Sequence, residues 1–339
     1  MTKRLTVIIP TCNRLQRITR CLEALERQDT PPGTFDVIVV DDGSTDGTAE
    51  ALKNRSSTLD VRVLSQANQG PAAARNRALA AGTAPLVLII NDDTILTEGA
   101  VRRHIDLHDA AGPGEKKIVL GNFRIMPEYR SDLFTAAVDA TTHIFPFSWL
   151  KARRILDFSY FITCNTSLAR AAFDEAGVFD ESFPKPAGED IEMGYRLYAK
   201  GWSIEFVPDL MSWHDSYFTP RSYARARFIR GEEDLRFIHK HPEQRGVYQR
   251  HALAFARSHY DRLVNHWDDY QAYVDSTVAL TDALIARHQA AQTPAERHGT
   301  LHDIMGRIEA IGYLAYAAGA GKSPYFAEVV RGFQPQAVF

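Results

Sequence analysis

The chain has 339 residues, of which 45% are hydrophobic and 24% are charged, and this composition excludes disordered, collagen-like and low-complexity proteins. At about 150 residues per domain, the length indicates two domains, or one large domain with an appendage. The 39 basic and 42 acidic residues leave a formal charge of −3, which argues against a protein that coats DNA or anionic lipid with its whole surface.

The sequence predicts a protein of a reducing, aqueous compartment. The longest clean apolar run, residues 86–90, is far shorter than the roughly 18 residues that a membrane-spanning helix needs. The basic start at Lys3 and Arg4 leads into a short apolar run that ends at Pro10, unlike a secretory signal. The 3 cysteines are widely spaced and favour neither a disulfide framework nor a zinc site. We expect a cytoplasmic protein, and peripheral contact at the inner face of a membrane stays open.

The first hundred residues alternate short β-rich runs with helical patterns, which is typical of a parallel sheet with crossover helices. The first run is apolar on both faces, as a buried parallel strand must be. The expected strands are residues 5–10, 35–41, 61–64 and 86–90, and the expected helices are residues 18–25, 48–53 and 72–81.

Residues 112–157 have no clear periodicity, because Gly-Pro-Gly, Met-Pro and Phe-Pro-Phe segments interrupt it, and we expect loops there. Regular patterns return beyond this stretch. The elements expected next are a strand at residues 160–163, a helix that begins at residue 187 or 188 and ends at 200, and a strand at residues 203–207.

The chain changes character after Pro220, where apolar residues recur at three- and four-residue spacing, as in amphipathic helices. The charge changes too, from 24 basic and 29 acidic residues up to residue 215 to 15 and 13 beyond it. We therefore expect an α/β domain over residues 1–215 and an α-helical region over residues 216–339. The helices expected in this region include residues 222–239, 249–266 and 272–291.

Polar turns follow the first two expected strands. One is Pro-Thr-Cys-Asn-Arg at residues 10–14, and the other is Asp-Asp-Gly-Ser-Thr-Asp-Gly-Thr at residues 41–48. Because parallel strands end at one edge of a sheet, where ligands bind, we expect both turns to share one crevice. The Ser-Thr-Asp-Gly part can simply cap the next helix, but this leaves Asp41 and Asp42 unexplained. Carboxylates at a strand end can accept hydrogen bonds from a base N–H or from ribose hydroxyls.

Asn91, Asp92 and Asp93 directly follow the fourth expected strand. The sequence has neither GxGxxG after its first strand nor GxxxxGK[ST], so a phosphorylated ligand would need another source of positive charge. Two carboxylates at a strand end suit a hard divalent cation that also binds substrate phosphates. Alternatively, Asp93 or Thr94 leads into the next helix, although a cap needs only one such residue.

An acidic helix is predicted at Gly-Glu-Asp-Ile-Glu-Met-Gly-Tyr-Arg-Leu, residues 188–197. Glu189 and Glu192 fall on a polar stripe of this helix, whereas Asp190 falls on its apolar side. The helix dipole explains an acid in the first turn but not an acid on the buried face. Asp190 is therefore a candidate general base.

His214 lies in Met-Ser-Trp-His-Asp, residues 211–215, after the last expected strand. A lone histidine beside tryptophan is as readily structural as metal-binding, and both interpretations stay open. Other histidines lie on expected helices with no such context. Those expected at the surface are His104, His108, His239 and His241.

The ordered segments PTCNR, VVDDGSTDGT, NDD, CNTSLARAAFDEAGVFDE, GEDIEMGYRL and WHD resemble the family 2 glycosyltransferases, over roughly Leu5 to Asp215. The resemblance implies the GT-A fold, a Rossmann-like α/β architecture with a mostly parallel sheet flanked by helices, followed here by the helical region. It also implies inverting transfer of a sugar from a nucleotide donor, usually UDP-linked, to an acceptor hydroxyl, with Mg²⁺ or Mn²⁺, as in polysaccharide or glycoconjugate biosynthesis.

The resemblance also implies roles for individual residues in donor binding. The nucleoside site would be lined by Thr11, Arg14 and Asp42. Asp41 would stand beside that site, and Asp92 would contact the ribose or the phosphate.

Metal and base are implied in the same way. The segment Asn91 to Asp93 matches the family's DXD element, so Asp93 would hold the metal together with His214, and Asp190 would be the base. Two departures bear on these roles. Asn91 stands at the first acid of DXD, which weakens metal binding or shifts it towards the next acid, and Cys12 replaces the aromatic residue that often stacks on uracil.

Other classes of function stay open at this point. A catalytically silent sugar-nucleotide-binding module would assemble with partners through its helices, but retention of Asp93 and Asp190 weighs against it. A sugar-phosphate nucleotidyltransferase would need a glycine-rich loop with a basic residue after the first strand, and the sequence has none there. Residues 217–230 interleave aromatic and basic side chains, as in a helix that packs on the core or contacts an anionic acceptor, a lipid-linked glycan surface or a second subunit.

The partners expected from the sequence are a nucleotide-sugar donor and a glycan, lipid-linked or small-molecule acceptor. No nucleic-acid partner is expected, because the charge is nearly balanced. A homo-oligomer formed through the C-terminal helices stays open.

Overall fold

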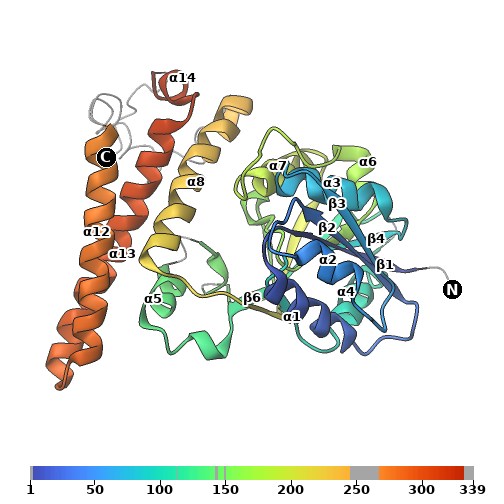
Figure 1. Ribbon diagram of the computed structural model, residues 1–339. Coiled ribbons are helices and arrows are strands. Elements are labelled where there is room, and N and C mark those ends of the chain that lie inside the picture. The colour runs from blue at the N-terminus through green and yellow to red at the C-terminus, as the bar shows by residue number, and fades with distance from the viewer. Residues whose placement is uncertain (1–2, 113, 142–143, 149, 245–266, 332–339) are drawn as a thin grey trace. The chain divides into compact units, whose positions relative to one another are not determined.

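The computed structural model describes residues 3–112, 114–141, 144–148, 150–244 and 267–331, and the helix expected at 249–266 lies outside them. The chain divides into two compact units (Figure 1). Unit 1 lies within residues 1–126 and 147–216, and unit 2 lies within residues 127–146 and 217–339.

One stretch differs from the domain boundary that the sequence suggested. Residues 127–146, expected as loops of the α/β domain, belong to unit 2. Within them Leu133–Thr141 form a helix, α5, whose Phe134 and Val138 pack in the core of unit 2. The helix is short and its partners are distant in sequence, so local periodicity does not reveal where it packs.

Unit 1 is built on a mixed sheet with the strand order β3-β2-β1-β4-β8-β6-β9-β5, and β7 pairs with β9. The expected parallel arrangement holds for β1 to β4 and for the pair β6 and β9, whereas β8, β5 and β7 run antiparallel to their neighbours. The strands are β1 (Leu5–Thr11), β2 (Phe35–Asp42), β3 (Val61–Gln66), β4 (Leu86–Ile89), β5 (Thr94–Leu96), β6 (Lys117–Ile125), β7 (Arg154–Leu156), β8 (Thr166–Ala169) and β9 (Ser203–His214).

Helices flank the sheet. Alternate residues of β1, such as Val7 and Ile9, pack against Ile18 and Leu22 of α1 and Val101 of α4, because successive side chains of a strand point to opposite faces. Helix α3 packs against β1 and β2. The helices of unit 1 are α1 (Leu15–Glu26), α2 (Thr48–Lys53), α3 (Pro71–Ala81), α4 (Ala100–Asp109), α6 (Ala171–Ala176) and α7 (Glu189–Ala199).

The strand expected at residues 160–163 is not formed. Phe158–Tyr160 make a short 3₁₀ helix instead, and Asp157 caps it by accepting a hydrogen bond from the Ser159 amide at 2.9 Å. The chain reaches the sheet only at Thr166, where β8 begins. A local cap thus overrides the β propensity of the aromatic run.

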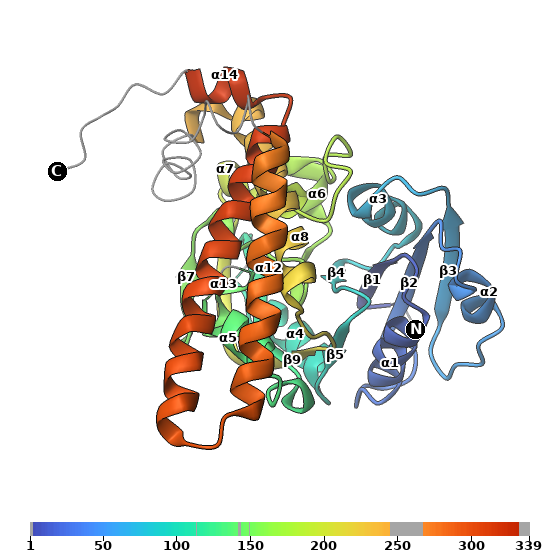
Figure 2. The same cartoon turned by 60° about the vertical axis from the view of Figure 1, so that its left-hand side comes forward.

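Unit 2 is helical. Helices α12 and α13 run side by side as a hairpin (Figure 2), and Thr293 begins α13 as a capping box with Glu296. Helix α8 lies against α13 at Gly231 and Gly319, where an added Cβ would overlap a backbone carbonyl of the facing helix. Besides α5, the α-helices described in this unit are α8 (Pro220–Lys240), α12 (Trp267–Ala290), α13 (Pro294–Lys322) and α14 (Phe326–Arg331).

None of the helices in the described parts of the chain has the length and apolar character needed to cross a membrane.

Candidate functional site

The parallel register of unit 1 brings the expected strand-end turns together. Thr11, the last residue of β1, is in register with Asp41 of β2. On its other side β1 pairs with β4, and the Thr11 hydroxyl donates a hydrogen bond to Asp92 Oδ2 at 2.8 Å. Both turns and the Asn91 to Asp93 segment therefore line the carboxyl edge of the sheet, where ligands of such sheets bind.

Asp41 and Asp42 are both buried, but they differ in how their oxygens are used. Asp42 accepts hydrogen bonds from Gln66 Nε2 and from the amides of Gln69 and Gly70, at 2.8 to 2.9 Å. Asp41 Oδ2 accepts one long bond, at 3.4 Å, and no described residue donates to its buried Oδ1. Asp42 thus holds the loop that enters α3, while Asp41 keeps a free acceptor atom in the crevice.

The two turns are also tied directly to each other. Asn13, whose φ of 55° is left-handed, donates its amide to Ser44 Oγ at 2.8 Å and accepts the Thr45 amide at 2.7 Å. Asp46 accepts the amide of Thr48, the first residue of α2, at 3.0 Å. The Ser-Thr-Asp-Gly part is therefore structural, as the capping interpretation held, and its role is to join the loops after β1 and β2.

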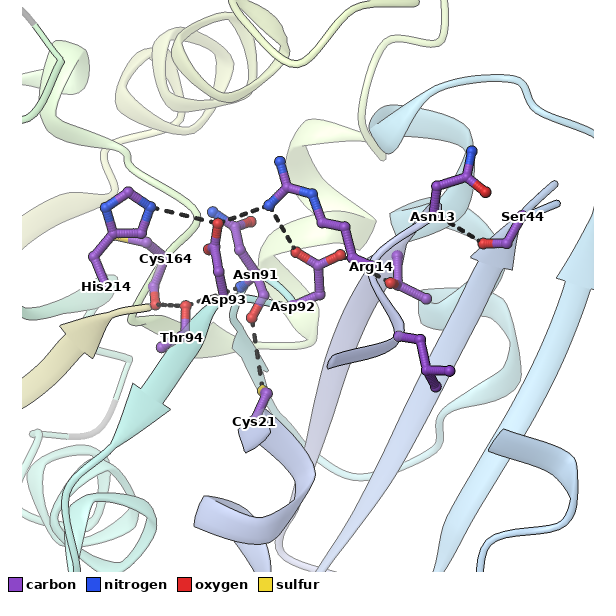
Figure 3. A network of polar contacts seen from close by, with 12 residues as sticks. Asn13, Arg14, Cys21, Ser44, Asn91, Asp92, Asp93, Thr94, Cys164 and His214 are labelled. Carbon is purple, nitrogen blue, oxygen red and sulfur yellow. Dashed lines mark hydrogen bonds and ion pairs between the residues drawn. The ribbon is translucent and has the colours of Figure 1, made fainter. Parts of the chain in front are cut away.

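Asp92 and Asp93 are buried side by side and share one basic partner, Arg14 (Figure 3). Arg14 Nη1 lies 3.2 Å from Asp92 Oδ1 and 2.7 Å from Asp93 Oδ2. The Arg14 side chain is itself 42% exposed. Arg14, which the resemblance assigns to the nucleoside site, thus has its guanidinium on the two acids in this structure.

His214 reaches Asp93 because β9 runs antiparallel to β5, with His214 in register with Thr94. The amide of Asp215 donates to the Asp93 carbonyl at 2.8 Å, and His214 Nε2 lies 3.4 Å from Asp93 Oδ2 (Figure 3). One cation could contact both atoms. Among the described residues no three His, Cys, Asp or Glu side chains form a metal-binding cluster. This donor set fits an ion that takes its other ligands from substrate oxygens and water.

The surrounding charges move the two acids in opposite directions. Burial and repulsion by Asp93 raise the pKa of Asp92 to about 6, against the attraction of Arg14. Burial acts on Asp93 as well, but His214 and Arg14 outweigh it and lower the pKa of that carboxyl. Of the two carboxyl groups, Asp93 is therefore the one that loses its proton at the lower pH.

The acidic helix α7 is oriented differently from the sequence expectation. Glu189 and Glu192, expected on a polar stripe, are almost fully buried, whereas Asp190 is half-buried. Glu192 binds Arg196 at 2.8 Å, and Glu189 binds Arg75 at 2.8 Å. Paired acids can occupy a buried face, and an amphipathic pattern that counts only apolar residues misses them.

Arg75 is a site residue that the sequence analysis missed. It lies on α3, is almost fully buried, and donates both to Glu189 Oε1 at 2.8 Å and to Asn91 Oδ1 at 3.1 Å. It thereby joins the start of α7 to the end of β4. Burial and the neighbouring Asp190 raise the pKa of Glu189 to about 7, against the pull of Arg75. The available signal was an arginine that follows three alanines within an alanine-rich helical run.

Asp190 and Asp93 both lie within electrostatic reach of Cys164. Burial raises the pKa of the Cys164 thiol, and the charges of Asp93 and Asp190 raise it further. Cys164 accepts a hydrogen bond from Thr94 through its carbonyl, at 3.0 Å, next to the Asn91 to Asp93 segment. A half-buried carboxylate at such a crevice can accept a proton from a bound hydroxyl.

Of the histidines expected at the surface, His104 is buried and His108 is half-buried. His104 is fully buried, with Nδ1 2.8 Å from Ser167 Oγ and Nε2 2.9 Å from Asn165 Oδ1, and His108 Nε2 lies 2.9 Å from the same Ser167 hydroxyl. Burial lowers the pKa of both rings to about 4, so they are neutral at physiological pH. They join α4 to β8, because the sheet covers that face of the helix. His239 and His241 are half-buried.

Comparison with known proteins gives the following similarities. The model of Glycosyl transferase family 2 matches residues 6–174. Over 262 residues the chain is 32% identical to a validoxylamine A glucosyltransferase of Streptomyces hygroscopicus subsp. limoneus, an alignment that covers 70% of this chain and 57% of that protein. A hyaluronan synthase of Pasteurella multocida is 27% identical over 240 residues, 62% of this chain and 24% of the synthase. The chain thus spans less than two thirds of the length of these relatives.

Solved structures share the fold. The mannosyltransferase PcManGT of Pyrobaculum calidifontis, in complex with GDP-Man and Mn²⁺, superposes with a TM-score of 0.56 at 21% identity, over 94% of this chain and 86% of that one. S. aureus TarS 1–349 in complex with UDP-GlcNAc gives 0.53 at 18% identity, over 94% and 90%. These matches confirm the expected α/β fold with flanking helices.

Proposed function

This chain belongs to glycosyl transferase family 2, and we propose that it transfers a sugar from a nucleotide-linked donor to an acceptor hydroxyl, with inversion at the anomeric carbon. The observation that carries the proposal is the crevice at the carboxyl edge of the sheet. Thr11, Asp41 and Asp92 lie there beside the Asp93 and His214 pair. The proposed binding groups for a nucleotide and the proposed acidic groups for a cation thus lie at one edge of the sheet.

The donor site is proposed to run along the ends of β1, β2 and β4. Asp41 Oδ1, which receives no hydrogen bond from any described residue, would accept a base N–H. Asp92, with Thr11 beside it, would bind the ribose or the phosphates. Asp42 Oδ2 accepts one hydrogen bond and can accept a further one, so Asp42 can also contact the nucleoside. A UDP-linked sugar is the proposed donor, and GDP-linked sugars are the alternative that the experiment below compares.

Mg²⁺ or Mn²⁺ is the proposed cofactor, held by Asp93 and His214. The 3.4 Å separation of Asp93 Oδ2 and His214 Nε2, both buried, supports a shared ion, and PcManGT is a relative in fold that binds Mn²⁺ with its nucleotide sugar. When bound, such a cation supplies positive charge that stabilises the leaving diphosphate as the bond from the anomeric carbon to the phosphate oxygen breaks.

Asp190 is the proposed general base. It would accept the proton of the acceptor hydroxyl from hydrogen-bond distance, about 2.6 to 3.2 Å, as that oxygen attacks the anomeric carbon opposite the leaving group. Arg75 acts as a positioning residue in this scheme, because it binds both Glu189, next to Asp190, and Asn91, next to the metal site. Transfer in a single displacement inverts the configuration at that carbon.

Calorimetry with UDP-glucose, UDP-GlcNAc and GDP-mannose, each with and without Mn²⁺, tests the donor site. We expect one nucleotide class to bind, and Mn²⁺ to tighten its binding in the native chain but not in Asp93→Asn. Asp109→Asn, at an exposed ion pair with Arg4, is the matched control and should keep the Mn²⁺ effect.

Product analysis then tests the chemistry. NMR of the product formed on an acceptor panel, or on water, should show the inverted anomer. Binding of a donor with neither transfer nor hydrolysis across a broad acceptor panel would instead favour the silent binding module.

A further inference from the structure

Arg14 occupies the place in the crevice where the divalent cation is proposed to bind. Its guanidinium lies 2.7 Å from Asp93 Oδ2, the oxygen that also faces His214, and 3.2 Å from Asp92 Oδ1. Figure 3 shows the side chain reaching over both acids from the start of α1. A guanidinium held close to this carboxylate oxygen disfavours a divalent cation on the same oxygen, because the two positive charges would repel each other at contact distance.

The three charged groups differ in their freedom to move. Asp92 and Asp93 are buried and fixed by further bonds, from the Thr11 hydroxyl at 2.8 Å and to His214 at 3.4 Å. Arg14 precedes α1, makes no side-chain cap to that helix, and has 42% of its side chain exposed. If the contact opens, the arginine is the member that can turn into solvent at little cost in packing.

Without a cation, two adjacent buried carboxylates would be costly, because burial and mutual repulsion both disfavour their charged forms. Arg14 supplies the missing positive charge. Burial lowers the pKa of Arg14, but the charges of Asp92 and Asp93 outweigh burial and raise this pKa above its ordinary value. Displacing Arg14 requires that it find another anion. A diphosphate meets this need, because guanidinium groups bind phosphate oxygens through two parallel hydrogen bonds.

We propose that Arg14 is an exchangeable counter-ion, which holds Asp92 and Asp93 before loading and passes to the donor diphosphate when the divalent cation takes its place on Asp93. This inference rests on the proposed function for the identity of the incoming ligands. It implies that the cation binds weakly alone and strongly with the nucleotide, since each arrival assists the exchange. Arg14 thereby couples the two binding events.

Electron paramagnetic resonance of free Mn²⁺ measures this coupling without any turnover. The native chain and Arg14→Gln are titrated with Mn²⁺, alone and with UDP or GDP, whichever the chain binds. Removing a competing charge-assisted contact should lower the Mn²⁺ Kd without nucleotide by about tenfold. The same change should raise the nucleotide Kd, so the factor by which nucleotide tightens Mn²⁺ binding should shrink.

Matched variants separate the effect of the direct contact of Arg14 with the two acids from the effect of positive charge farther away. Arg17→Gln removes a charge of the same helix that acts on Asp92 and Asp93 only through space, and should shift the Mn²⁺ Kd in the same direction but less. Arg4→Gln, at an exposed pair with Asp109, should change nothing. Arg14→Lys should lie between native and Arg14→Gln. Circular dichroism and thermal unfolding establish that each variant is folded, and Mn²⁺ should raise the Tm of Arg14→Gln more than that of the native chain.

The outcomes discriminate between the two proposals. An unchanged Mn²⁺ Kd in Arg14→Gln, with binding still abolished by Asp93→Asn, would overturn the counter-ion role and leave the metal-dependent function standing. Absence of Mn²⁺ binding by every variant, even with nucleotide, would overturn both the counter-ion role and the metal part of the proposed function.

Discussion

Both units of the molecule bury acids, but they hold them differently. In unit 2, Asp234 of α8 accepts a hydrogen bond from Tyr316 Oη at 2.9 Å and forms an ion pair with Arg230 at 2.6 Å, one helical turn away. In unit 1, Asp41 has an oxygen to which no described residue donates a hydrogen bond, and Asp93 pairs with a half-exposed arginine and with His214. A buried acid alone is therefore no sign of a ligand site. The sign is a buried acid whose partner is missing or is free to leave.

The largest expected contrast between the units is between catalysis and stability. Asp190→Asn should keep the fold and donor binding but lower kcat by about 10²- to 10⁴-fold, because the base is lost. Asp234→Asn should leave kcat per folded molecule unchanged and lower the free energy of unfolding by about 1 to 3 kcal/mol. Transfer kinetics and urea unfolding of both variants check this, and near-normal turnover by Asp190→Asn would remove it as the base.

A second prediction concerns a polar network of unit 1 that is paired like those of unit 2. The pKa of His104 is about 4 in the folded chain and near 6.5 when unfolded, so the unfolded chain binds more protons between these values. The contribution of the neutral His104 ring to the free energy of unfolding is fully present above about pH 6.5. It is lost as the pH drops to 4, and its size is on the order of 3 kcal/mol.

Urea unfolding of the native chain and of His104→Gln at several pH values measures this effect. The stability difference between the two should shrink on acidification. His302→Gln, at an exposed position of α13, is the control and should follow the native pH profile. Parallel curves for the native chain and His104→Gln would contradict the neutral buried ring.

The close approach of α8 and α13 gives a third prediction, confined to unit 2. Gly319→Ala would drive a Cβ into the Phe228 carbonyl and should cost about 1 to 3 kcal/mol of stability. Gly306→Ala on the same helix meets no described atom within 4 Å and should stabilise it by about 0.5 to 1 kcal/mol. Thermal unfolding compares the two, with nucleotide binding by unit 1 expected to stay unchanged. Equal effects of the two substitutions on stability would contradict the close approach of α8 and α13 at Gly319.

The adjacent acids of β2 give the smallest and most local prediction. Asp41→Asn should raise the nucleotide Kd about tenfold while leaving stability unchanged or higher, because the charge it removes is buried with an unpartnered oxygen. Asp42→Asn should lower stability by about 1 kcal/mol, because an amide replaces an oxygen that accepts backbone N–H groups. Calorimetry and urea unfolding separate the two effects, and the reverse pattern would exchange their roles.

The sequence predicted well those parts of unit 1 that depend on local patterns. The apolar runs of β1, β2, β3 and β4 and the polar turns after them follow from residue type and order, so the carboxyl edge of the sheet was foreseeable. The prediction that His214 and Asp93 share a site came from the family resemblance. The register between β9 and β5 that brings them together is non-local and was not predictable.

Residues whose position depends on an ion pair or on packing with distant parts of the chain were harder to predict. The periodicity of α7 put Glu189 on a solvent stripe, yet its ion pair with Arg75 keeps it buried, and Asp190 is the more exposed of the two. The assignment of residues 127–146 failed for a similar reason. Phe134 of α5 packs with residues of unit 2, among them Tyr223, that are far along the chain.

The chain leaves unit 1 for unit 2 directly after Met126 and directly after Ser216, and both exits border the Asp93 site. Met126 donates its amide to the His214 carbonyl at 3.2 Å, and Arg20 of α1 binds Asp215 at 2.8 Å and contacts the Met126 sulfur at 3.7 Å. His214 is therefore hydrogen-bonded to one exit and lies two residues before the other. By thermodynamic reciprocity, any partner of unit 2 that alters donor affinity must itself be bound more or less tightly, by the same factor, when the donor is present.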